Sequence, residues 1–171
     1  MEKEKTDFFD QLDRLSKGER ILLKRACGQT LERSSAATKL LFYRLLPYGT
    51  AQWEEERWFA VACLHCLEDA DLEKERRFPL AVQLRKEAAG AGNESGKKRG
   101  QILMDTDWDE DGFFVSKLFR LVKYLKQKGY AIDCERLLRD LLSWNSDKKY
   151  AQKQWAREMV MKESSEQTVE K

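Results

Sequence analysis

Apolar residues recur at the spacing of an α-helix along most of this chain, and no stretch alternates for long enough to predict a β-strand. The clearest example is the stripe formed by Phe114, Leu118, Leu121, Val122 and Leu125. Its positions fall on one face of a helix, which predicts burial of that face. With only 2 prolines and 36% charged residues, the composition is typical of long helices with solvated outer faces. We therefore expect an all-α fold.

Local signals predict where several of these helices begin and end. The expected N-caps are Thr6, Ser34 or Ser35, Thr50, Asp133, and Ser146 or Asp147. A helix through residues 21–23 is expected to end at Gly28. Acids at 109–111 precede the helix of the apolar stripe, and lysines occupy its last turn. Both sets of charges complement the helix dipole.

Residues 88–100 read AAGAGNESGKKRG and contain four glycines. This composition is typical of a flexible linker. We therefore expect two small helical bundles joined by a Gly-rich linker. The N-terminal helical domain is expected over 1–88, the linker over 89–100 and the C-terminal helical bundle over 101–163, followed by a disordered tail over 164–171.

Three features that could carry chemistry are better explained by structure. Cys63 and Cys66 resemble half of a zinc site, but no second pair of ligands follows, so core packing is the favoured interpretation. His65 is the single histidine, and no nucleophile on a strained turn accompanies it. The acidic run 105–111 lacks the glycine and glutamate of a calcium-binding EF-hand loop. We expect no catalytic residue, no metal and no cofactor.

The chain carries no sign of a membrane or an export route. No apolar run approaches the roughly 20 residues that a membrane-spanning helix requires. The first residues alternate in charge, unlike those of a signal or transit peptide. We expect no membrane partner, reduced cysteines and a cytoplasmic location.

The net charge of +2 conceals a segregation of charge along the chain. Residues 15–50 hold 7 basic and 2 acidic residues, whereas residues 51–75 hold 2 basic and 8 acidic. Between 112 and 132 there are 5 basic residues and no acid. An ordinary solvated helix intersperses glutamates among its lysines. The charge pattern alone fits a polyanion-binding face and a merely lysine-rich surface about equally well.

Several segments, taken together, resemble the CasB family, the small subunit of the type I-E CRISPR Cascade complex. They are Lys24–Ala26, Phe42–Pro47, Leu118–Leu125, Leu137–Asn145 and Ala151–Arg157. Each motif by itself has low specificity, because it consists mainly of leucine, tryptophan and arginine at helical spacing. Their common order and spacing, which agree over about residues 8–160, are more specific.

The resemblance implies an all-helical protein without enzymatic activity, present in two copies along a ribonucleoprotein. Its expected partners are other Cascade subunits, guide RNA, target DNA and a second copy of itself. There it would contact nucleic-acid backbones and stabilise the R-loop in antiviral defence. The residues that the resemblance assigns to this contact by position are Lys24, Arg25, Arg44, Lys98, Arg99, Arg120 and Lys123.

Local charge alone adds Lys117, Lys148 and Lys149 to this set. Binding through phosphates is expected to tolerate any base sequence and to weaken steeply with salt. The rival hypothesis is a helical protein–protein adaptor that never contacts nucleic acid. In that case the basic faces would meet acidic protein partners.

Overall fold

The structure is a computed structural model that describes residues 2–69 and 72–161. Over these residues it is dominated by α-helices, which confirms the expected all-α class. The α-helices are Glu2–Asp13 (α1), Lys17–Arg25 (α2), Ala36–Leu45 (α3), Glu55–His65 (α4), Leu80–Ala91 (α5), Ser95–Met104 (α6), Phe113–Gln127 (α7), Cys134–Leu142 (α8) and Tyr150–Val160 (α9). Two strands of two residues each, Arg77–Phe78 (β1) and Ala131–Ile132 (β2), pair in parallel.

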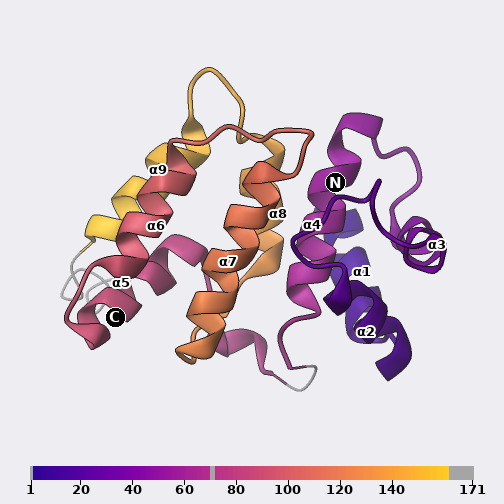
Figure 1. The fold of residues 1–171 in the computed structure, drawn as a ribbon, viewed down its shortest axis with the longest axis horizontal. Coiled ribbons are helices and arrows are strands. Elements are labelled where there is room, and N and C mark those ends of the chain that lie inside the picture. Colours follow the sequence, from indigo (N-terminus) through magenta and orange to yellow (C-terminus); the bar gives the residue numbers. More distant parts are fainter. Residues whose placement is uncertain (1, 70–71, 162–171) are drawn as a thin grey trace.

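The helices form an elongated body with one end built from α1 to α4 and the other from α5, α6 and α9 (Figure 1). Helices α7 and α8 lie between the two ends. Helix α4 packs on α8 and α7, whereas α5 packs on α6, α7 and α9. One hydrophobic cluster runs through the whole body, from Phe8 in α1 through Leu118 in α7 to Met159 in α9.

The glycine-rich segment is helical except for a short turn at 92–94, so the expectation of a linker over 89–100 was wrong. Helix α5 continues to Ala91, and α6 begins at Ser95. Gly96 and Gly100, one turn apart on α6, face α5. A Cβ atom at Gly100 would lie 2.6 Å from Leu84 Cδ1. These two glycines therefore let α6 approach α5 closely.

Helix α5 lies on the other side of the domain boundary from the one expected. Residues 80–88 were assigned to an N-terminal domain, but their helix packs on α6, α7 and α9 of the expected C-terminal bundle. The pairing of β1 with β2 joins the start of this segment to the residues after α7. The predicted tail, 164–171, lies outside the described residues.

Two predicted N-caps are confirmed. The Ser35 side chain accepts a hydrogen bond from the Thr38 amide, and the Asp133 carboxylate accepts one from the Arg136 amide. The helix expected to end at Gly28 ends earlier, at Arg25 with Ala26 as its C-cap, and Gly28 lies in the following turn with a φ of 84°, a conformation that side chains other than glycine rarely adopt.

Three other caps were predicted wrongly. Thr6 lies inside α1, where its hydroxyl donates to the Glu2 carbonyl. The Thr50 hydroxyl donates back to the Pro47 carbonyl, and a short 3-10 helix precedes α4. The cap of α9 is Lys149, in the left-handed region with a φ of 52°, in place of Ser146 or Asp147.

The groups that might have carried metal or redox chemistry are packed in the core. All four cysteines are buried and free, which confirms core packing for Cys63 and Cys66. The His65 ring is also buried, with Nε2 2.7 Å from Asp13 Oδ1 of α1. Across the described ranges, no cluster of three or more metal-ligating side chains occurs. Within the same ranges, no helix has the length and apolarity needed to cross a bilayer.

Candidate nucleic-acid interface

Helix α7 has one buried and one basic face. The apolar stripe predicted from the sequence is buried, with Leu118 and Leu125 fully inaccessible to solvent. The start of the helix is held by Asp109, whose carboxylate accepts hydrogen bonds from the amides of Phe113 and Phe114. Because the inner face and the first turn are fixed, the outer face has a defined orientation. The basic residues of α7 are Lys117, Arg120, Lys123 and Lys126.

Three of these side chains, Lys117, Arg120 and Lys123, form no ion pair with a carboxylate within the described part of the chain. The Lys117 ammonium lies 4.6 Å from the centre of the Phe113 ring, and the Lys123 ammonium lies 5.8 Å from that of Phe119. Arg120 is exposed, and Lys126 donates to the carbonyl of Leu67. Contacts with aromatic rings position the ammonium groups without neutralising them.

Helix α6 adds a further cation beside α7. The Arg99 guanidinium lies 4.4 Å from the centre of the Tyr124 ring. The Tyr124 hydroxyl in turn donates to Glu87 Oε1 at 2.6 Å, and this hydrogen bond raises the pKa of Tyr124. Lys98, the neighbour of Arg99, is exposed on the same helix.

Three of the predicted residues line one groove between α6 and α7. It has a volume of about 440 Å³ and is lined by Arg99, Ile102, Lys117, Arg120 and Leu121. No carboxylate is among the lining residues. Sequence reasoning missed Ile102 as part of this surface, although it lies one helical turn from Arg99 and is 54% exposed.

Lys24 and Arg25 lie exposed in the last turn of α2. The turn after this helix packs on Phe119, since a Cβ atom at Gly28 would lie 2.8 Å from Phe119 Cδ1. Phe119 is the ring beneath Lys123. The turn after α2 is therefore adjacent to the part of α7 that carries Lys123.

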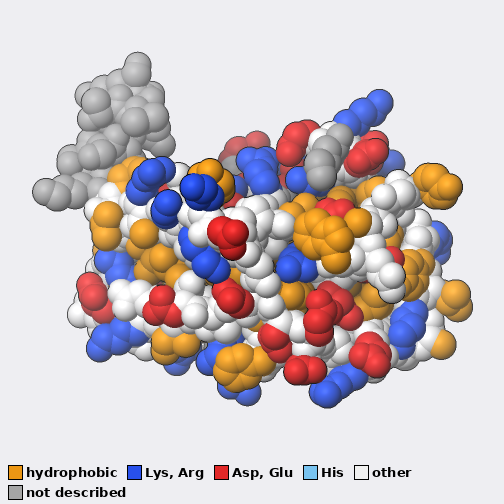
Figure 2. Space-filling view, turned by 90° about the horizontal axis from the view of Figure 1, so that it is seen from above, with side chains coloured by type: hydrophobic (Ala, Val, Ile, Leu, Met, Phe, Trp, Pro, Cys, Tyr) orange, Lys and Arg blue, Asp and Glu red, His pale blue; other side chains and the backbone are white. Residues whose placement is uncertain are grey.

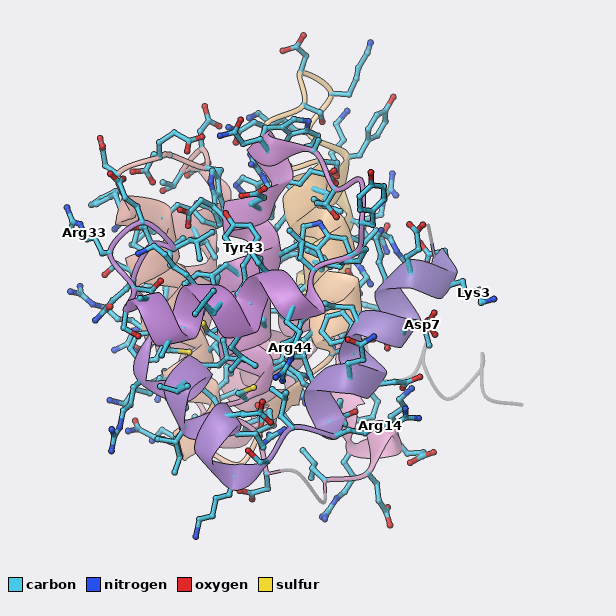
Figure 3. The ribbon with its side chains drawn as sticks, turned by 90° about the vertical axis from the view of Figure 1, so that its right-hand side faces the viewer. Lys3, Asp7, Arg14, Arg33, Tyr43 and Arg44 are labelled. Carbon is cyan, nitrogen blue, oxygen red and sulfur yellow. The ribbon has the colours of Figure 1, made fainter. Side chains whose placement is uncertain are left out.

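Arg44 is placed differently from the expectation. Its Nη2 lies 2.5 Å from Glu19 Oε2, so this guanidinium already has a carboxylate partner. The hydrogen bond from Arg44 lowers the pKa of Glu19. Figure 3 shows Arg44 on α3, at the end of the molecule formed by α1 to α3, away from the groove between α6 and α7. The structure thus does not bring Arg44 together with Arg99 and Arg120.

Lys148 and Lys149 form a second separate location, in the turn between α8 and α9. Lys149 Nζ lies 2.8 Å from Asp107 Oδ1, so this lysine is also paired with a carboxylate, whereas Lys148 is exposed. Figure 2, which views the molecule from above, shows acidic side chains beside basic ones on this side. The side seen there is not a face of a single sign.

A family model and a curated relative both relate this chain to the same group of proteins. Residues 19–158 match the family model described as CRISPR-associated protein Cse2. The chain is 33% identical over 175 residues to a CRISPR-associated protein Cse2 from Thermus thermophilus, covering 92% of this chain and 98% of the relative.

Solved structures share the fold. A crystal structure of a Cse2-family protein from Thermus thermophilus has a TM-score of 0.74 at 30% identity, covering 91% of this chain and 96% of the other. The crystal structure of CasB from M. ruber also gives 0.74, at 21% identity and 97% coverage of both chains. A chain of a structure named as a CRISPR RNA-guided surveillance complex gives 0.72 at 21% identity, covering 98% of this chain and 96% of that one.

Proposed function

The chain belongs to the Cse2 (CasB) family of CRISPR-associated proteins, and from this premise we propose that it is a non-catalytic small subunit of a type I-E Cascade surveillance complex. In this role it contacts the phosphate backbones of guide RNA, target DNA or the displaced strand and stabilises the R-loop in antiviral defence. The proposed partners are other Cascade subunits and a second copy of the chain, in the cytoplasm. A similar chain in a CRISPR RNA-guided surveillance complex supports the assembly.

One observation carries the proposal: Lys117, Arg120 and Lys123 of α7 have no carboxylate partner within the described residues, and the helix itself contains no acidic residue. A row of like charges repels itself, and this repulsion is relieved when a polyanion lies along the row. Arg99 of α6 extends the row across the groove. This arrangement favours a phosphate backbone over an isolated small anion, because its cations are spread along about three helical turns.

The mechanism is neutralisation of phosphate charge. Forming an R-loop exchanges one duplex for another of similar stability, so a few contacts to phosphates are enough to shift the balance. Such contacts carry no sequence information, which suits a subunit that must accept any guide and target. The chain needs only exposed cations held at fixed positions, as on α7 and α6.

A second candidate function, a protein–protein adaptor, is favoured by a different observation. The end of the molecule formed by α1 to α4 exposes several large apolar side chains. They are Leu40, Tyr43, Tyr48 and Trp53. Exposed apolar groups of this size commonly mark contacts with other proteins. A subunit that binds nucleic acid through α7 can also use this end for a protein neighbour, whereas in a pure adaptor the α7 cations would meet an acidic protein partner.

Titration with nucleic acid separates the two functions. The full chain is titrated into a fluorescently labelled 30-nucleotide single strand and into the matching duplex at several salt concentrations. The proposal predicts binding at low salt and a steep loss of affinity as salt rises. A strand with an uncharged methylphosphonate backbone is the control and should not bind. Absence of binding to the charged strands at the lowest salt would leave only the adaptor.

A further inference from the structure

The groove between α6 and α7 has two chemically different parts. Its cations are Arg99, Lys117 and Arg120, and its exposed apolar surface comes from Ile102, whereas Leu121 of the lining is buried. A surface that binds only phosphates has no use for an isoleucine left 54% exposed to water. The combination therefore fits a ligand with both an anionic and an apolar part.

Helix geometry places the two parts side by side. Arg99 and Ile102 are one turn apart on α6, and Lys117 and Leu121 are one turn apart on α7. Both helices thus present cations to the same groove, and α6 adds the exposed side chain of Ile102. A ligand that bridges the helices meets positive charge beside this apolar side chain.

The cations of the groove are supported before any ligand arrives. Arg99 rests on the Tyr124 ring, which is tied to the buried Glu87 through its hydroxyl. Lys117 lies over the Phe113 ring, which is itself 60% exposed. Long side chains that are already placed lose less conformational freedom when they bind an anion. Neither contact cancels the positive charge.

We propose that this groove binds one unstacked nucleotide of a single strand, with its base against Ile102 and its phosphate among Arg99, Lys117 and Arg120. The inference rests on the proposed function and deepens it, since it names single-stranded nucleic acid as the ligand class. A duplex keeps the faces of its bases stacked inside, so it cannot lay a base against Ile102. The volume of about 440 Å³ lies within the range of about 300–1,000 Å³ common for small-ligand sites.

The test compares two labelled 12-unit oligomers with the same phosphate charge. One is oligothymidine, and the other has abasic tetrahydrofuran units throughout. At one moderate salt concentration, the parent protein should bind oligothymidine about five to tenfold more tightly, because only this oligomer offers bases for apolar contact. Ile102→Ala should lower the affinity for oligothymidine to near the abasic level and leave the abasic affinity unchanged.

Leu40→Ala is the matched control, since Leu40 is also an exposed aliphatic residue of a helix but lies at the other end of the molecule. It should change neither affinity. Equal binding of both oligomers by the parent would overturn the base contact while leaving backbone binding intact. An equal loss for both oligomers in Ile102→Ala would also overturn it. If the parent bound neither oligomer, the proposed function would fail together with this inference.

Discussion

Gly100 of α6 lies so close to Leu84 of α5 that a Cβ atom on the glycine would be 2.6 Å from Leu84 Cδ1. Leu84 is fully buried, so it has little room to move. Gly100→Ala should therefore lower the free energy of unfolding by about 1–3 kcal/mol, measured by urea denaturation. Gly18→Ala is the control, because no atom lies within 4 Å of its new methyl group. Gly18→Ala should stabilise the protein by about 0.4–1 kcal/mol. If Gly100→Ala left the free energy of unfolding unchanged, the close packing of α6 on α5 would be contradicted.

The same contact explains why the sequence misleads at this segment. Glycine is typical both of flexible linkers and of helix faces that pack closely, and composition cannot separate the two. The distinction depends on Gly96 and Gly100 facing α5, a relationship between residues that no local pattern reveals. By contrast, the stripe of α7 and the cap at Asp133 depend on neighbours within a few positions, and both were predicted correctly.

The candidate site was predictable only in part for a similar reason. The absence of acids near Lys117, Arg120 and Lys123 can be read from the sequence, because helix neighbours are three or four residues apart. The partners of Arg44 and Lys149, namely Glu19 and Asp107, are distant in the chain. Tertiary packing alone reveals which cations are paired.

Trp155 donates a hydrogen bond from Nε1 to Asp140 Oδ2 at 2.7 Å inside the core. Trp155→Phe keeps an aromatic ring but leaves the buried carboxylate short of one donor. We expect its free energy of unfolding to fall by about 1–3 kcal/mol more than in a Trp→Phe variant that breaks no hydrogen bond. Trp58→Phe supplies the comparison, since Trp58 is buried and its Nε1 has no partner within the described residues. Equal losses for the two variants in urea denaturation would contradict a role for the hydrogen bond.

Asp13 gives the protein an acid-sensitive contact. Burial alone would raise the pKa of this carboxyl, but the hydrogen bond from His65 and the charges of His65, Arg77 and Arg20 outweigh burial and lower it. A lowered folded-state pKa adds stability above the ordinary value of 3.8, and this stability is lost as pH falls through the folded-state pKa.

Asp13→Asn should therefore lower the free energy of unfolding by about 1 kcal/mol at pH 7, since solvent screens this half-exposed contact. The loss should be much smaller once the pH is below the folded-state pKa of Asp13. Urea denaturation at a series of pH values measures the difference. Asp7→Asn, a change at an exposed carboxylate of the same helix, should be nearly neutral at every pH. A cost for Asp13→Asn that stayed constant down to low pH would contradict the ionic contact.

Arg44 and Arg120 should contribute unequally to nucleic-acid binding. Arg44 is paired with Glu19 and lies at the opposite end from the groove, whereas Arg120 is unpaired within the described residues and lines the groove. In single-strand titrations, Arg44→Ala should change affinity less than about twofold. Arg120→Ala should reduce the salt slope, the slope of log affinity against log salt concentration, by about 0.7. A larger effect from Arg44→Ala would place the contact surface on α3.

The most direct test of the basic α7 face is the salt dependence of single-strand binding by two triple variants with the same change in net charge. One carries Lys117→Glu, Arg120→Glu and Lys123→Glu. The other carries Lys3→Glu, Arg14→Glu and Arg33→Glu, at exposed positions of the end shown in Figure 3. The first should lose most of the affinity and about 2 units of salt slope, while the second keeps the parent's slope. If the two variants lost equal affinity, or if the first bound as tightly as the parent, the α7 face would not be the contact surface for nucleic acid.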